Sequence, residues 1–147
     1  MKQLDLRRHA QREPDDDRLS PEGIARAEDV GRTLPLDYAI IFISPKRRAA
    51  ETVAWFLRGS GQQLGEHAVV DGLAGSYEEI PDVVIQLFDD IPEGGRGLAV
   101  GHTPLIEEAV VSITGTGIEP LAECEGVRLT LGDDGSWQVE EFRVDPV

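Results

Sequence analysis

Short apolar runs alternate with longer segments of helical period, and this alternation most limits what the chain can fold into. The runs at residues 4–6, 38–43, 69–70 and 97–100 are too short for helices and predict buried strands. Strands that alternate with helices predict a mainly parallel sheet with helices on both faces, a three-layer α/β/α sandwich. The predicted helical faces are Ile24, Ala27, Val30 and Leu34; Ala49, Val53, Phe56 and Leu57; Ile80, Val84, Leu87, Phe88 and Ile91; and Leu105, Ala109, Val110 and Ile113.

The pattern changes near the end of the chain. Residues 127–131 and 137–142 alternate between apolar and polar types around Asp133-Asp134-Gly135, which predicts a C-terminal antiparallel hairpin. A chain of 147 residues with 40% apolar content can bury a core without the support of disulfide bonds or structural metal ions. We therefore expect one domain over residues 1–147.

The charge of the chain restricts its partners. Its net charge of −14 opposes binding to DNA, RNA or anionic membranes. The first residues carry charge instead of a signal sequence, and no uncharged run approaches the roughly 18 apolar residues that span a bilayer. We expect a soluble cytoplasmic protein, for which a monomer is compatible with the sequence. Cys124 is the only cysteine, so it is expected to be a small buried residue and not part of a disulfide or zinc site.

A hydroxyl residue followed by proline occurs where three of the helices are expected to begin. Ser20, Ser44 and Thr103 each precede a proline, a pattern typical of a helix N-cap. Ser44 and Thr103 also come shortly after predicted strands, so the helix N-termini would face the crevice at the carboxyl ends of the sheet. Free N–H groups and the helix dipole favour an anion there.

Cations and imidazoles gather at the same strand ends. His9 and His102 follow the first and fourth predicted strands. Half of the 14 Lys and Arg residues lie near two strand ends, which predicts a local positive potential and a bound phosphate. These cations are Arg7, Arg8, Arg12, Arg18, Lys46, Arg47 and Arg48.

Four segments resemble the histidine phosphatase superfamily, which includes the cofactor-dependent phosphoglycerate mutases. They are LRRHA at 6–10, LSPEGIARA at 19–27, SPKRRAAET at 44–52 and VGHTP at 100–104. The resemblance implies a phosphoglycerate mutase-like fold and a phosphatase in which His9 accepts the phosphoryl group. It assigns the phosphate clamp to Arg8, Arg48 and His102, with Ser44 and Thr103 beside them, and it implies no cofactor and no metal. Adjacent guanidinium groups would keep the imidazole of His9 neutral and nucleophilic.

The chain departs from the larger members of that superfamily in two ways. The segment at 71–80 offers only Glu78 and Glu79 as candidates for the acid that protonates a leaving alkoxide. No long insertion is present to roof the site, so an open crevice is expected. Both features resemble the small bacterial branch that acts on phosphohistidine in proteins, since imidazole needs less help from an acid. Arg18 either faces phosphate, as is common in that branch, or pairs with the aspartates at 15–17.

Three functions remain open at this stage. The substrate is phosphohistidine in a protein or a small phosphate ester such as a sugar phosphate or a nucleotide, or else the chain is a non-catalytic phosphate-binding regulatory domain. Mutase activity is disfavoured because no segment can close over the phosphoenzyme. His67 and the aspartates at 15–17 are predicted to be solvated. Arg7, which alternates with Arg8 along a strand, is expected to point the other way and to form an ion pair elsewhere.

Overall fold

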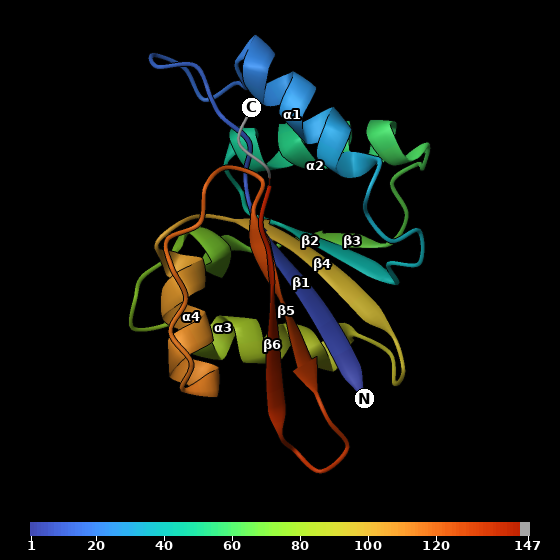
Figure 1. Ribbon diagram of the computed structural model, residues 1–147, viewed down its shortest axis with the longest axis vertical. Helices are drawn as coiled ribbons and strands as arrows, with labels where there is room; N and C mark the ends of the chain where they lie inside the picture. Colours follow the sequence, from blue (N-terminus) through green and yellow to red (C-terminus); the bar gives the residue numbers. More distant parts are fainter. Residues whose placement is uncertain (145–147) are drawn as a thin grey trace.

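The computed structural model describes residues 1–144, which form a six-stranded sheet with helices on both sides (Figure 1). The strands are β1 (Lys2–Arg8), β2 (Ile40–Ile43), β3 (His67–Val69), β4 (Arg96–Gly101), β5 (Gly126–Leu131) and β6 (Trp137–Phe142). The helices are α1 (Pro21–Gly31), α2 (Arg47–Ser60), α3 (Ile80–Leu87) and α4 (Leu105–Thr114), with short 3₁₀ turns at Asp71–Ala74 and Phe88–Asp90.

The strand order is β3-β2-β4-β1-β5-β6. The first four of these strands are parallel to one another, whereas β5 is antiparallel to β1 and to β6. Figure 1 shows α1 and α2 on one face of the sheet and α3 and α4 on the other. The predicted three-layer sandwich with a C-terminal hairpin is therefore confirmed.

Each face of the sheet has its own apolar core. Leu4 and Leu6 of β1 pack with α3 and α4, while Ile41 and Ile43 of β2 pack with α1 and α2. The opposite faces follow from the alternation of side chains along a strand. Cys124 is fully buried in the second core, as predicted. Within the described residues, no helix is long and apolar enough to cross a bilayer.

One of the three predicted helix caps is confirmed and two are wrong. Ser20 caps α1, because its hydroxyl accepts a hydrogen bond from the Gly23 N–H at 3.0 Å. Ser44 directly follows β2 and its N–H donates to the Val100 carbonyl of β4 at 3.2 Å, while α2 begins only at Arg47. Thr103 does not cap α4, because its hydroxyl donates to Glu107 one turn further on.

Candidate functional site

Two histidines follow two neighbouring parallel strands. Arg8, the last residue of β1, lies opposite Gly101, the last residue of β4. His9 comes next, and its backbone N–H donates to the Gly101 carbonyl at 3.0 Å, while His102 directly follows β4. The ring centroids of the two histidines are therefore only 5.2 Å apart.

The next strand along the sheet supplies two more of the predicted residues. Ser44 directly follows β2, and Arg48 lies in the first turn of α2. The Arg48 Nε–H donates to Nε2 of His9 at 3.3 Å. The structure thus brings Arg8, His9, Arg48 and His102 together at the carboxyl edge of the sheet, where ligands bind in open α/β folds.

His9 is oriented by its own backbone. Its Nδ1 lies 2.7 Å from the Ala10 carbonyl, an acceptor, so Nδ1 carries the proton and the lone pair of Nε2 accepts the hydrogen bond from Arg48. Burial lowers the pKa of His9, and the charges of Arg48 and Arg8 lower it further. The imidazole is consequently neutral at pH 7, with Nε2 facing Arg48.

His102 has a ring nitrogen without a partner beside His9. Its Nε2 lies 2.6 Å from Oγ of Ser44, which also accepts a hydrogen bond from the Lys46 N–H at 3.3 Å. When the Ser44 hydroxyl donates its proton to Nε2, the ring proton of His102 lies on Nδ1. That Nδ1 is buried without a partner. Burial and then the nearby His9, Arg48 and Lys46 lower the pKa of His102 to about 4.

Arg8 leaves a second donor unused. Its Nη1 donates to the Leu121 carbonyl at 2.8 Å and lies 3.3 Å from a carboxylate oxygen of Glu123. Its Nε is buried and has no partner. A buried unpaired donor is costly unless a ligand satisfies it, so the Nε–H of Arg8 favours an acceptor-rich guest such as phosphate.

Asp17 is a site residue that the sequence interpretation missed. Its Oδ1 lies 2.5 Å from Nη1 of Arg48, and its Oδ2 accepts a hydrogen bond from the Arg47 N–H at 2.8 Å. Partial burial raises the pKa of Asp17, but the hydrogen bonds from Arg48 and Arg47 outweigh burial and keep this pKa below its usual value. The expected solvated turn is therefore wrong for this aspartate. Nothing in the run at 15–17 distinguishes Asp17 from its neighbours.

Thr52 connects the segment that carries His9 to the helix turn that carries Arg48. Its hydroxyl accepts a hydrogen bond from the Ala10 N–H at 2.9 Å and donates to the Arg48 carbonyl at 2.7 Å. The side chain is fully buried. A buried threonine in an apolar helical stripe is the signal that could have identified it.

Glu107 connects α4 to the loop that holds Arg8. One carboxylate oxygen accepts hydrogen bonds from the Thr103 hydroxyl and from the Leu121 N–H, the latter at 3.0 Å. The carbonyl of the same Leu121 accepts the hydrogen bond from Arg8. Thr103 thus takes part in the support of the site.

Three of the predicted residues form no hydrogen bond with either histidine. Arg18 is 59% exposed in its side chain and pairs with Asp16 at 3.6 Å, which is one of the two arrangements expected for it. Glu78 and Glu79 are exposed, and within residues 1–144 their carboxylates have no hydrogen bond or ion pair. A role for either as an acid stays a prediction.

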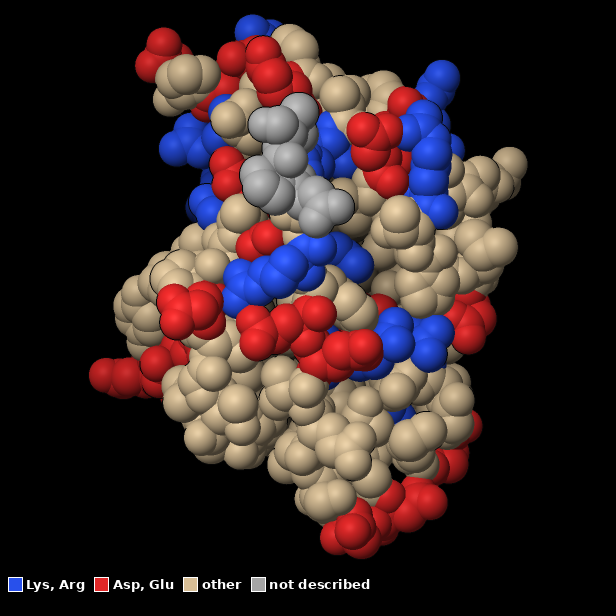
Figure 2. Space-filling model, in the orientation of Figure 1, with Lys and Arg blue, Asp and Glu red and all other residues tan. Residues whose placement is uncertain are grey.

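The expected concentration of positive charge is reduced by acidic partners. Arg47 pairs with Glu51, as Arg18 pairs with Asp16, so neither charge stands alone. Figure 2 shows basic and acidic side chains interspersed over the upper part of the molecule, where α1 and α2 lie. Among residues 1–144, no group of three His, Cys, Asp or Glu side chains is arranged to hold a metal ion.

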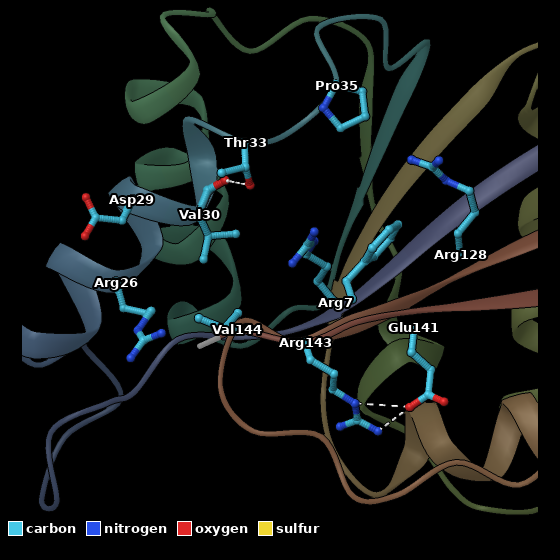
Figure 3. A pocket seen from close by; sticks show the side chains of 11 residues that line it. Arg7, Arg26, Asp29, Val30, Thr33, Pro35, Arg128, Glu141, Arg143 and Val144 are labelled. Atoms are coloured by element: carbon cyan, nitrogen blue, oxygen red, sulfur yellow. Dashed lines mark hydrogen bonds and ion pairs between the residues drawn. The ribbon is translucent and has the colours of Figure 1, made fainter. Parts of the chain in front are cut away.

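Arg7 points away from the site, as predicted. It lines a cavity of about 600 Å³ beside α1 that contains none of the four clustered residues (Figure 3). The expected ion pair is wrong: Arg7 donates to the Cys124 carbonyl at 2.8 Å and stacks on the Phe142 ring at 4.7 Å. Neither histidine of the cluster lines this cavity.

The sequence matches no protein-family model and no curated protein. Solved structures do match it. The protein histidine phosphatase SixA complexed with tungstate has a TM-score of 0.73 and 18% identity, covering 96% of each chain.

Two further structures are similar over almost their whole length. Phosphoserine phosphatase from Entamoeba histolytica gives a TM-score of 0.76 at 15% identity, covering 99% of this chain and 98% of that one. A mycobacterial glucosyl-3-phosphoglycerate phosphatase gives 0.70 at 19% identity, covering 99% and 100%. At these identities the likeness concerns the fold, and the chain has the fold of the histidine phosphatase superfamily.

Proposed function

We propose that this protein is a phosphatase that works through a phosphohistidine on His9. The observation that carries the proposal is the set of donors around one neutral imidazole. The Arg48 Nε–H already points at Nε2 of His9, Arg8 holds a buried donor without a partner, and so does His102 when its ring proton lies on Nδ1. A phosphoryl group offers the oxygens that these donors need.

The proposed reaction has two steps. Nε2 of His9 attacks phosphorus, the bond from phosphorus to the leaving group breaks, and the electron pair of that bond departs with the leaving group. Water then attacks phosphorus, the bond from phosphorus to Nε2 breaks and its electron pair returns to Nε2, while the proton of the water leaves with the phosphate, so that the neutral imidazole is restored. In both steps charge spreads over the non-bridging oxygens, where Arg8, Arg48 and His102 stabilise it without a metal ion.

The favoured substrate is phosphohistidine carried by another protein. Asp17 and Glu123 are each paired with an arginine, and the pKa of Asp17 is lowered, so it is a poor proton donor. Glu78 and Glu79 are exposed, and their carboxylates form no hydrogen bond with the four clustered residues. An imidazole leaving group tolerates the lack of a strong acid better than an alkoxide does.

Small phosphate esters are the second candidate. Phosphatases of phosphoserine and of glucosyl-3-phosphoglycerate share the fold. Turnover of a phosphohistidine protein and of a panel of esters by the same preparation separates the two substrate classes. We expect the larger kcat/KM for the phosphohistidine protein.

Replacement of the nucleophile tests the proposed activity. His9→Ala should abolish phosphate release, because the remaining clamp has no nitrogen to accept phosphorus. His67→Ala is the matched control, since His67 is an exposed histidine on the edge strand β3. Phosphate release is measured with colorimetric detection for both variants. Retention of most of the activity by His9→Ala would refute the proposal, as would an equal loss in both variants.

A further inference from the structure

Both arginines of the proposed clamp are already paired with a carboxylate. Asp17 lies 2.5 Å from Arg48, and Glu123 lies 3.3 Å from Arg8. Asp17 belongs to the loop before α1 and Glu123 to the loop before β5, so two separate segments supply them. Each carboxylate is 35% exposed in its side chain and therefore remains accessible to a bound molecule.

The fields of these carboxylates reach the reacting groups. Burial has the largest effect on His9 and on His102 and lowers the pKa of each. Glu123 acts in the opposite direction on the pKa of His9, and Asp17 does so on the pKa of His102. A second charge carried by a substrate close to phosphorus would meet the same two fields.

The charges of the site almost balance. Arg8 and Arg48 are offset by the two carboxylates, and Lys46 is the other cation whose field reaches His102. Since both imidazoles are neutral, about one positive charge remains. One phosphoryl group can neutralise that charge and accept hydrogen bonds from the unpaired donors. Any additional anionic group of the substrate is then repelled by Asp17 or Glu123, and no further cation offsets the repulsion.

We propose that Asp17 and Glu123 determine specificity by charge: they favour substrates whose phosphoryl group is the only anion and disfavour those with a second anionic group close to phosphorus. Bisphosphates, nucleoside diphosphates and phosphorylated carboxylic acids belong to the disfavoured class. The proposal rests on the proposed function only in that a phosphoryl group occupies the site beside His9. One such repulsion across a partly exposed site changes affinity on the order of tenfold.

The test compares two ligands that differ by one carboxylate. Phenylphosphonate and 4-carboxyphenylphosphonate are not hydrolysed, so calorimetric titration gives their Kd values whether or not the protein turns over a substrate. The wild type should bind phenylphosphonate about tenfold more tightly at low salt, and high salt should reduce that ratio. Asp17→Asn and Glu123→Gln should each lower the ratio to about threefold or less.

The controls separate a charge effect from a structural one. Asp16→Asn removes an acidic neighbour on the same loop that pairs with Arg18, and it should keep the tenfold ratio. The amide oxygen of Asp17→Asn can still accept the hydrogen bond from the Arg47 N–H, and Glu123→Gln changes a different loop.

The outcomes distinguish this inference from the proposed function. Equal binding of the two phosphonates by the wild type, or an unchanged ratio in both variants, overturns the charge selection and leaves the phosphatase standing. If the protein prefers phenylphosphonate to 4-carboxyphenylphosphonate tenfold but has no phosphatase activity, only the proposed function is overturned. Failure of both phosphonates to bind overturns both, because no anion then occupies the site.

Discussion

His102 shows at the scale of one residue how the site constrains protonation. The ring is 7% exposed, and Ser44 holds Nε2 while Nδ1 has no partner. The low pKa of about 4 means that the folded protein resists protonation of this ring far more than the unfolded chain does. The cost of keeping such a group neutral becomes visible as a pH dependence of stability.

The sign of that dependence follows from the lowered pKa. Above pH 6.5 His102 is neutral in both the folded and unfolded states, whereas between pH 6.5 and about 4 only the unfolded chain binds the proton. Stability is therefore fully present above pH 6.5 and is lost as pH falls toward 4. From pH 7 to pH 5 this residue alone should lower the free energy of unfolding by about 2 kcal/mol.

Urea denaturation at pH 7 and pH 5 measures this effect. His102→Gln, which can still hydrogen-bond to Ser44, should lose about 2 kcal/mol less than the wild type over that interval. His67→Gln changes an exposed histidine and should behave like the wild type. If His102→Gln and the wild type show the same pH dependence, His102 is not the buried neutral group described.

The clustering of Arg8, His9, Arg48 and His102 is predictable, because each follows a strand or opens a helix at the same edge of a parallel sheet. Asp17 and Glu123 are not predictable in the same way. Both lie in loops, and only the folded arrangement brings one to Arg48 and the other to Arg8. Loop residues meet their partners through tertiary contacts that no local periodicity encodes.

At the scale of an element, α2 joins the two sides of the site. Its first turn carries Arg48, and Thr52 one turn later binds the backbone of Ala10 beside the nucleophile. Asp17 accepts a hydrogen bond from the Arg47 N–H at the beginning of the helix. It thus takes the place of Ser44, which was expected to cap this helix. The motif indicates a helix start, but it could not show that the Ser44 N–H is hydrogen-bonded to the Val100 carbonyl just after β2.

Removal of the Thr52 hydroxyl should destabilise the fold. Thr52→Val keeps the shape but leaves the buried Ala10 N–H without its acceptor, which costs about 1–3 kcal/mol. Thr52→Ser retains the hydroxyl and should lose less. Urea denaturation at pH 7 gives the free energy of unfolding for each variant. A valine variant as stable as the wild type would show that the hydroxyl does not join α2 to the segment after β1.

At the scale of the molecule, the layers are readable from the sequence and the order of the strands is not. Runs such as residues 38–43 and 97–100 are apolar on both faces, which is typical of strands covered by helices on each side. Their side chains do not encode that β4 lies between β1 and β2. That order nonetheless brings the two histidines together, because His9 and His102 directly follow adjacent strands.

The net charge of the whole chain also acts on the site. With 28 acidic and 14 basic residues, the molecule supplies a carboxylate for most of its cations, including those of the clamp. After these pairings, the site offers an anion a small set of hydrogen-bond donors and about one positive charge that no carboxylate offsets. Directed donors suit one phosphoryl group better than a polyanion, and they are preorganised before it binds.

Trapping of the phosphorylated intermediate tests the account most directly. The protein is mixed with a phosphohistidine protein, quenched with base within milliseconds to preserve the acid-labile bond, digested and examined by mass spectrometry. We expect phosphate on His9, bonded to Nε2 because Nδ1 is engaged by the Ala10 carbonyl, and no phosphopeptide from His9→Ala. Phosphate on another residue, or rapid phosphate release with none ever found on His9, would contradict the account.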